Sequence, residues 1–126
     1  MRFWDTSAVI PLISEEATSD VVSDLLHEDR EITVWWGTWV ECSVAISRLS
    51  REGSLDVESE EEARASLDLL AEDWREVQPT DEVRSLSAAF VWRESTDEDL
   101  GFVCLDDRLR QAATDEGFEM LPMETE

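Results

Sequence analysis

Three acidic residues stand where their carboxylates could do chemistry together. Asp5 directly follows a short apolar run at the start of the chain, and Asp106 directly follows the apolar run Phe102–Leu105. Glu41 lies in the first turn expected for a helix that comes after a third apolar run. Carboxylates held close together repel one another unless a cation joins them. Mg²⁺ and Mn²⁺ take oxygen ligands of this kind, and a carboxylate cluster holding them can activate water and stabilise a phosphoryl transition state.

Each of these acids also has a purely structural interpretation. Asp5 could simply cap the turn that follows it. Thr38 and Glu41 have the spacing of a capping box, in which Glu41 would be a structural acid. Asp106 and Asp107 both precede a predicted helix, and we expect Asp107 to be its N-cap, which leaves Asp106 nearer the strand end. The shared placement of the three acids supports a metal site more strongly than any one of them.

Hydrophobic periodicity and capping residues predict strands that alternate with helices. The predicted strands cover residues 1–4, 32–36, 76–78, 101–105 and 118–121. The predicted helices cover residues 18–28, 38–51, 59–75, 80–94 and 108–116, and a buried segment broken by Pro11 covers residues 8–13. Residues 101–105 form the most clearly buried of the predicted strands. This alternation is typical of an α/β fold with a parallel sheet covered on both faces, whose sites lie at the carboxyl ends of the strands.

The composition limits the kind of protein this can be. A chain of 126 residues with 42% hydrophobic side chains suits one globular domain. No apolar run approaches the ~18 residues of a membrane span, and no signal-peptide pattern is present, so we expect a cytoplasmic protein without membrane contact. Cys42 and Cys104 lack metal-ligand spacing and are predicted to be buried free thiols.

Charge is the strongest compositional signal. The chain has 32 acidic and 10 basic side chains, every basic one is arginine, and the net charge is −22. Such a surface is typical of adaptation to high salt, and binding to a basic protein partner is the alternative. The missing lysine argues against phosphoacceptor receivers and haloacid-dehalogenase-like phosphatases, which rely on one. The sequence also lacks a P-loop, a glycine-rich dinucleotide motif and a serine nucleophile elbow.

Several segments resemble the PIN-domain family, in particular the VapC-type toxins of toxin–antitoxin pairs. The opening Phe3-Trp4-Asp5-Thr6-Ser7-Ala8 is similar to the first family motif, and Glu41 with the helix that runs to Arg51 is similar to the second. The segment Phe102-Val-Cys-Leu-Asp106-Asp-Arg-Leu109 resembles the late strand and its acid. The resemblance implies a single PIN-like domain over residues 1–126, a three-layer sandwich with a mostly parallel central sheet flanked by helices.

The resemblance also implies an activity, a cofactor and partners. PIN domains of this type are metal-dependent ribonucleases that use Mg²⁺ or Mn²⁺, pair with a cognate antitoxin and are often homodimers. Asp5, Glu41 and Asp106 would then be the catalytic, metal-binding residues. Thr6 and Ser7 would support these ligands. The expected contacts to RNA phosphates are Arg48, Arg51, Arg108 and Arg110.

The chain departs from the family pattern at one place. PIN domains usually carry a further aspartate on an extra helix before the late strand, and this chain is too short there to hold it. Four acids follow in the same region and could replace that aspartate: Glu94, Asp97, Glu98 and Asp99. The alternative function is therefore a PIN-fold binding module, with impaired catalysis, that pairs with an antitoxin-like protein through its early helices. The Trp35, Trp36 and Trp39 cluster fits either RNA bases or a core or partner interface.

Overall fold

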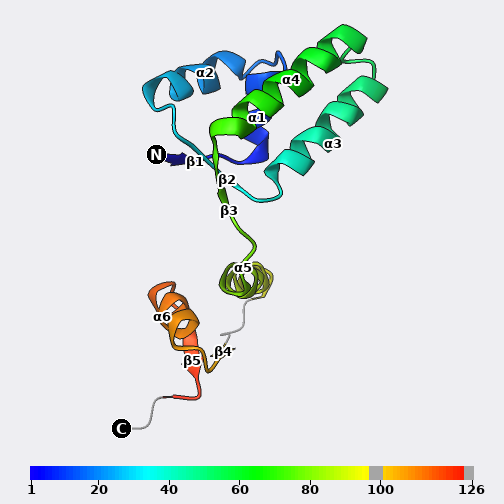
Figure 1. The fold of residues 1–126 in the computed structure, drawn as a ribbon. Coiled ribbons are helices and arrows are strands. Elements are labelled where there is room, and N and C mark those ends of the chain that lie inside the picture. Colours follow the sequence, from blue (N-terminus) through cyan, green and yellow to red (C-terminus); the bar gives the residue numbers. More distant parts are fainter. Residues whose placement is uncertain (97–100, 124–126) are drawn as a thin grey trace. The chain divides into compact units, whose positions relative to one another are not determined.

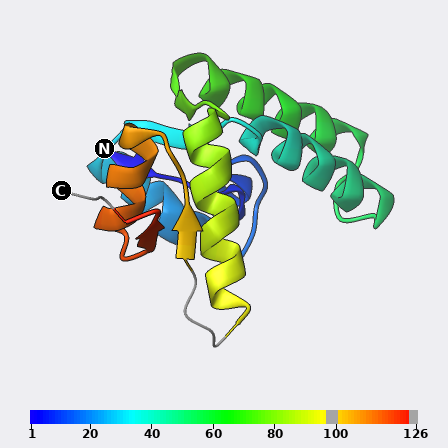
Figure 2. The same ribbon diagram turned by 90° about the horizontal axis from the view of Figure 1, so that it is seen from below.

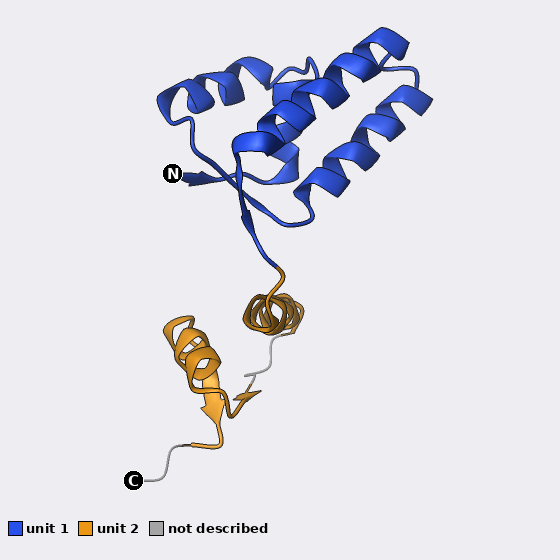
Figure 3. Cartoon of the chain, viewed as in Figure 1, with its two compact units in different colours: residues 1–78 blue, residues 79–126 orange. Residues whose placement is uncertain are grey.

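The structure is a computed structural model that describes residues 1–96 and 101–123. It divides into two compact units, Met1–Gln78 and Pro79–Glu126 (Figure 3). The described residues form six helices and five short strands, and both units contain parallel strands, so the predicted α/β class is confirmed (Figure 1). The single PIN-like domain over residues 1–126 stays a prediction.

The first unit contains a three-stranded parallel sheet and four helices. Its elements are β1 (Arg2–Phe3), α1 (Thr6–Ile13), α2 (Ser19–Glu28), β2 (Ile32–Trp35), α3 (Thr38–Arg51), α4 (Val57–Asp73) and β3 (Arg75–Val77). The strand order is β1-β2-β3, with Phe3 opposite Thr33 and Thr33 opposite Arg75. Because the three strands are parallel, Asp5 and the start of α3 both follow carboxyl ends at the same edge of this sheet.

The core of the first unit lies between β2 and the helices. Ile32 and Val34 on β2 are buried, whereas the alternate residues Thr33 and Trp35 are half-buried. The helices contribute buried side chains to the same cluster, including Val9, Ile10, Ile13, Val22, Cys42, Ala45, Ile46, Ala63 and Leu67. Helices α3 and α4 run side by side in both views (Figures 1 and 2). This packing fixes the start of α3, and with it Glu41, against the rest of the unit.

The second unit is smaller and contains a two-stranded parallel sheet. Its elements are α5 (Asp81–Glu94), β4 (Gly101–Val103), α6 (Asp107–Asp115) and β5 (Glu119–Leu121). The strands pair with Phe102 opposite Met120. Phe118 packs edge-to-face on Phe90 and Phe102, with ring centroids 5.5 and 5.7 Å apart. Gly117, at φ +85°, ends α6 in a left-handed conformation that glycine adopts without strain.

Several predicted boundaries were wrong in instructive ways. Helix α4 begins at Val57 rather than Ser59, because Asp56 is its N-cap and accepts the amide of Ser59 at 2.8 Å. Pro11 does not break the segment before α2; it lies inside α1, with its ring buried among apolar neighbours. Burial of that helix face offsets the backbone hydrogen bond that proline cannot make.

The strand predicted to be the most buried is instead largely exposed. In β4, Val103 is 75% exposed, and Leu105 just beyond it is 82% exposed. Within the described residues of the second unit, β4 pairs with β5, and α5 and α6 cover little of it. An apolar run predicts a buried strand only when something packs on both of its faces.

Candidate functional site

Asp5 lies at the carboxyl end of β1 and is the N-cap of α1. The Ser7 hydroxyl and amide both donate to Oδ2 of Asp5, at 2.6 and 3.1 Å. These two hydrogen bonds, joined by the Thr6 amide and slightly opposed by burial, hold the pKa of Asp5 below its usual 3.8. Asp5 is therefore both a helix cap and a permanently charged carboxylate at neutral pH, which is the form that binds a cation.

Glu41 lies in the first turn of α3 and is exposed. The capping-box interpretation of Glu41 was wrong, because Gly37 is the N-cap of α3 and Thr38 is a buried helical residue. Glu41 makes no side-chain hydrogen bond to the described part of the chain, which leaves its carboxylate available. The indole of Trp35 lies directly against Gly37, so any larger residue at this helix start would force the indole to shift.

The starts of α1 and α3, which carry Asp5 and Glu41, follow the adjacent parallel strands β1 and β2. Cys42 is fully buried, and burial followed by the charges of Glu41 and Asp5 raises its pKa to about 11. Two of the three predicted acids therefore stand at the same edge of one sheet, at the starts of the contacting helices α1 and α3. Cys42 itself is an inert thiol, as expected, whereas Cys104 is half-buried.

Asp106 occupies in the second unit the position that Asp5 has in the first. It follows a parallel strand, and its Oδ1 accepts the amide of Leu109 at 2.9 Å as the N-cap of α6. Asp107 was expected to be that cap, which was wrong: Asp107 is the first helical residue. The amide of Asp106 donates to Cys104 Sγ at 3.4 Å, which fixes the turn between β4 and α6.

The two units are described separately, so the predicted meeting of Asp106 with Asp5 and Glu41 stays a prediction. Within the residues that the structure describes, no group of three or more His, Cys, Asp or Glu side chains has the arrangement of a metal site. Of the acids proposed to replace the missing aspartate, Glu94 is the last residue of α5. Asp97, Glu98 and Asp99 lie outside the described residues.

The four arginines predicted to contact RNA have different surroundings. Arg48 and Arg51 are exposed on the last turns of α3, and Arg108 is an exposed residue 3.7 Å from Glu82. Arg110 is engaged with the protein itself. Its guanidinium donates to the carbonyl oxygens of Cys104, Leu121 and Pro122 and so joins α6 to the ends of both strands. Arg110 therefore has fewer donors left for a phosphate than the other three.

The tryptophans near the start of α3 are not core residues. Trp36 is 50% exposed and Trp39 is 41% exposed, with the Trp39 indole donating to Asp68 Oδ1 at 3.2 Å. Trp35 is half-buried and packs edge-to-face on Trp36. Their exposure leaves open the two remaining interpretations, contact with RNA bases and contact with a protein partner.

Sequence reasoning missed a cavity between α2 and α4. The exposed side chain of His27 lines this cavity with Arg30 and Asp73. No local sequence pattern marks this cavity, because the residues that line it come from segments far apart in the chain.

Comparison of the chain with protein-family models gives no match, and comparison with curated proteins gives none. Across the described residues, no helix combines the length and the apolar character that crossing a membrane requires. The functional argument therefore depends on the geometry of the acids and on the motifs themselves.

Proposed function

We propose that this protein is a metal-dependent ribonuclease of the PIN type, a toxin of a type II toxin–antitoxin pair that hydrolyses RNA phosphodiesters. The observation that carries the proposal is that Asp5 and Glu41 stand at the starts of α1 and α3, at the carboxyl edge shared by the parallel strands β1 and β2. Asp106 supports it, because Asp106 repeats the strand-end, helix-cap position of Asp5. RNA, an antitoxin protein and a second copy of the chain are the proposed partners.

The residues divide the work of such a site between them. Mg²⁺ or Mn²⁺, when bound, supplies Lewis-acid activation of water and neutralises charge on the phosphate. Asp5, held ionised by Ser7, and Glu41, whose carboxylate has no protein partner, would hold the cation together with Asp106. Arg48 and Arg51 on α3 would attract the RNA backbone locally, since the net charge of −22 repels it elsewhere.

An RNA cleavage assay at high salt tests this function. We expect the full chain to cut a labelled single-stranded RNA in the presence of Mn²⁺. We expect this cleavage to stop when the metal is chelated. Removing a residue that only orients a metal ligand typically lowers metal affinity or activity about 10–100-fold. Removing a ligand itself should have at least that effect. Asp5→Asn, Glu41→Gln and Asp106→Asn should therefore each lower the cleavage rate by about a hundredfold or more. Glu52→Gln, at the end of α3, and Asp107→Asn are the matched controls and should cut normally. Equal rates for Glu41→Gln and Glu52→Gln would contradict the proposed site.

We also propose that both parallel sheets belong to one PIN-like three-layer sandwich. Two edge strands with exposed apolar side chains support this: Phe3 on β1 is 62% exposed, and Val103 on β4 is 75% exposed. The amide of Trp4 donates to Thr33 on β2, so by strand alternation the amide of Phe3 points to the opposite edge. By the same alternation the amide of Val103 points away from β5, because Cys104 donates to Leu121.

Hydrogen exchange of these two amides tests the sandwich. In one continuous sheet, the amides of Phe3 and Val103 are hydrogen-bonded and exchange slowly, at rates close to that of Trp4. In two separate sheets, both amides face solvent and exchange rapidly. Rapid exchange at both positions would reject the sandwich while leaving the α/β class in place.

A second candidate function is a binding module that pairs with an antitoxin-like protein through its early helices. The observation that favours it is an exposed apolar pair on α2, with Val21 61% and Leu25 38% exposed one helical turn apart. This module would keep the fold and cut no RNA with any metal. Cleavage by the unmodified chain that Asp5→Asn abolishes would reject it.

A further inference from the structure

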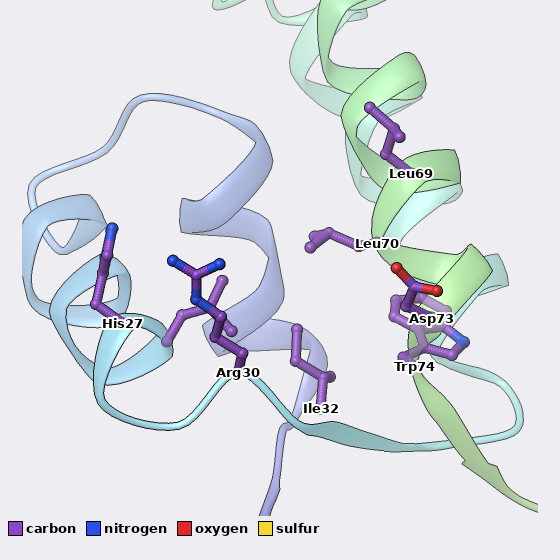
Figure 4. Close-up of a pocket in the computed structure, with 8 residues that line it drawn as sticks. His27, Arg30, Ile32, Leu69, Leu70, Asp73 and Trp74 are labelled. Carbon is purple, nitrogen blue, oxygen red and sulfur yellow. The ribbon is translucent and has the colours of Figure 1, made fainter.

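A cavity in the first unit has an apolar floor and charged walls. It has a volume of about 250 Å³ and opens between α2 and α4 (Figure 4). Its apolar lining comes from three elements: Leu26, Ile32, Leu69, Leu70 and Trp74. Ligand pockets in proteins are mostly apolar with a few placed polar groups and usually span about 300–1,000 Å³. This cavity has that character but lies just below the range in volume, so its ligand would be small.

One wall of the cavity carries a guanidinium and an imidazole in a protein that is otherwise strongly acidic. His27 lies at the end of α2, Arg30 lies just beyond it, and both line the cavity on the side opposite α4 (Figure 4). The side chain of Arg30 has no hydrogen bond or ion pair with any residue in the described ranges, whereas Arg2 and Arg64 pair with Glu28 and Glu60. An unpaired guanidinium beside apolar surface is well suited to bind a planar anion through two hydrogen bonds.

His27 is oriented by its own helix. Its Nδ1 lies 2.7 Å from the carbonyl oxygen of Ser23, one turn earlier in α2. With Nδ1–H donating to that carbonyl, Nε2 is the ring atom left for another partner. When both ring nitrogens carry a proton, Nε2 donates, and His27 and Arg30 can then act on one anion.

The opposite wall sets a limit on the ligand. Asp73, near the end of α4, places a carboxylate beside Trp74 and across the cavity from Arg30 (Figure 4). It has no ion pair within the described part of the chain. A second negative charge at the far end of a ligand would meet Asp73 and be repelled. The cavity therefore distinguishes one anionic group from two.

We propose that this cavity binds a small monocarboxylate with an apolar body. The carboxylate pairs with Arg30 and His27, and the apolar body covers Leu26, Ile32, Leu70 and Trp74. Dicarboxylates and polyphosphates are disfavoured by Asp73 and by the net charge of −22. This binding site is independent of the proposed ribonuclease site, so either proposal can fail without the other.

Three six-carbon probes with different ends test the assignment: hexanoate, hexanamide and adipate. The full chain is titrated with each at one salt concentration, and NMR follows the indole N–H of Trp74 and the ring of His27. We expect hexanoate to bind saturably at millimolar or lower concentration. Hexanamide, which lacks the charge, and adipate, which adds a second one, should each bind about tenfold more weakly or not at all.

Matched variants assign the binding to the charged walls. Arg30→Gln should weaken hexanoate binding about tenfold. Arg30→Lys keeps the charge but loses the two parallel N–H donors of the guanidinium, and it should weaken binding less. Arg84→Gln makes the same change at an exposed arginine of α5 and should have no effect. Asp73→Asn should make the affinity for adipate more similar to the affinity for hexanoate. Arg30 is exposed, so its variants should stay folded, which the dispersion of the NMR spectrum checks directly.

Three results would overturn the proposal. Hexanamide could bind as tightly as hexanoate, which would make the cavity a simple apolar site. Arg30→Gln and Arg84→Gln could bind hexanoate equally, which would remove the cationic wall from recognition. Hexanoate could fail to shift the Trp74 and His27 signals at any concentration up to tens of millimolar, which would leave the cavity without this ligand.

Discussion

The carboxylate of Asp5 is a helix cap, and this role is compatible with the metal-ligand role that sequence reasoning treated as its alternative. It caps α1 through Ser7, and the same hydrogen bonds keep it ionised. A capping carboxylate uses part of its hydrogen-bonding capacity, because a carboxylate has about four lone-pair sites. Capping and metal binding are therefore compatible on one side chain. Asp106, which caps α6 through Oδ1, likewise has lone-pair sites left to bind a cation.

Replacing Ser7 with alanine should change how Asp5 titrates. The Ser7 hydroxyl is the largest cause of the lowered pKa of Asp5, so in Ser7→Ala that pKa should rise toward 3.8. A lowered carboxylate pKa stabilises the fold above the ordinary value, and this stabilisation is lost as the pH falls through the lowered pKa. Ser7→Ala should therefore lose part of the stability above pH 4. Carboxyl ¹³C titration by NMR measures the shift, and unchanged titration relative to the control Ser87→Ala would contradict it.

At the scale of elements, the first unit depends on the packing of α3 against its neighbours. Ile46 and Cys42 on the inner face of α3 are fully buried, whereas Val44 on its outer face is 60% exposed. The polar side of the same contact is a network in which Arg64 of α4 donates to the hydroxyls of Ser43 and Ser47. This packing determines the position of Glu41, which lies in the first turn of α3.

Two substitutions on α3 separate the inner from the outer face. Ile46→Ala removes buried methyl groups and leaves a cavity, so it should lower the free energy of unfolding by about 2–5 kcal/mol. Val44→Ala removes exposed surface and should change it by less than about 0.5 kcal/mol. Urea unfolding at high salt, followed by tryptophan fluorescence, measures both. Similar losses for the two variants would show that α3 packs differently.

In the second unit, Arg110 should matter for stability more than Arg108. Arg110 donates to carbonyl oxygens at the ends of β4 and β5, whereas Arg108 is exposed. Arg110→Ala should therefore destabilise this unit by about 1–3 kcal/mol, since hydrogen bonds to a charged group are lost. Arg108→Ala should cost less than about 0.5 kcal/mol. Hydrogen exchange at the Cys104 amide, which bonds Leu121, reports the difference. Faster exchange in Arg108→Ala than in Arg110→Ala would contradict this assignment.

The positions of the helices and strands were easier to predict from the sequence than the burial and contacts of their side chains. Local signals act within one turn of the chain, and the helices predicted over residues 80–94 and 108–116 are confirmed as α5, which Thr80 caps, and α6, which Gly117 follows. The choice between Asp106 and Asp107 as a cap depends on one residue of register, which composition does not resolve. The exposure of β4 and the cavity beside Arg30 depend on contacts between distant segments, which no local pattern contains.

At the scale of the whole molecule, charge dominates the expected behaviour. With 32 acidic and 10 basic side chains, most exposed charges have like-charged neighbours. The ion pairs formed by described residues lie mainly on exposed side chains, as with Arg2–Glu28 and Arg108–Glu82, and such pairs contribute little. The folded state should therefore be limited by self-repulsion in dilute salt.

Salt should stabilise the fold strongly. Raising KCl from 0.1 to 1 M shortens the Debye length from about 10 to about 3 Å and screens the repulsion among acids. We expect the thermal midpoint to rise by about 10 °C or more, equivalent to roughly 2 kcal/mol. Circular dichroism melts across a KCl series measure this, with sucrose as a control that does not screen charge. A midpoint that does not change across the series would argue that the acidity serves a basic partner instead.

Mn²⁺ binding tests the central claim, that Asp5 belongs to a metal site, most directly. Calorimetry at high salt would compare the unmodified chain with Asp5→Asn, which keeps a good N-cap for α1, and with the control Asp107→Asn. We predict saturable binding to the unmodified chain and to Asp107→Asn, and loss of that binding in Asp5→Asn. Equal binding by all three proteins, or binding by none, would contradict the metal site and leave Asp5 as a helix cap in a binding module.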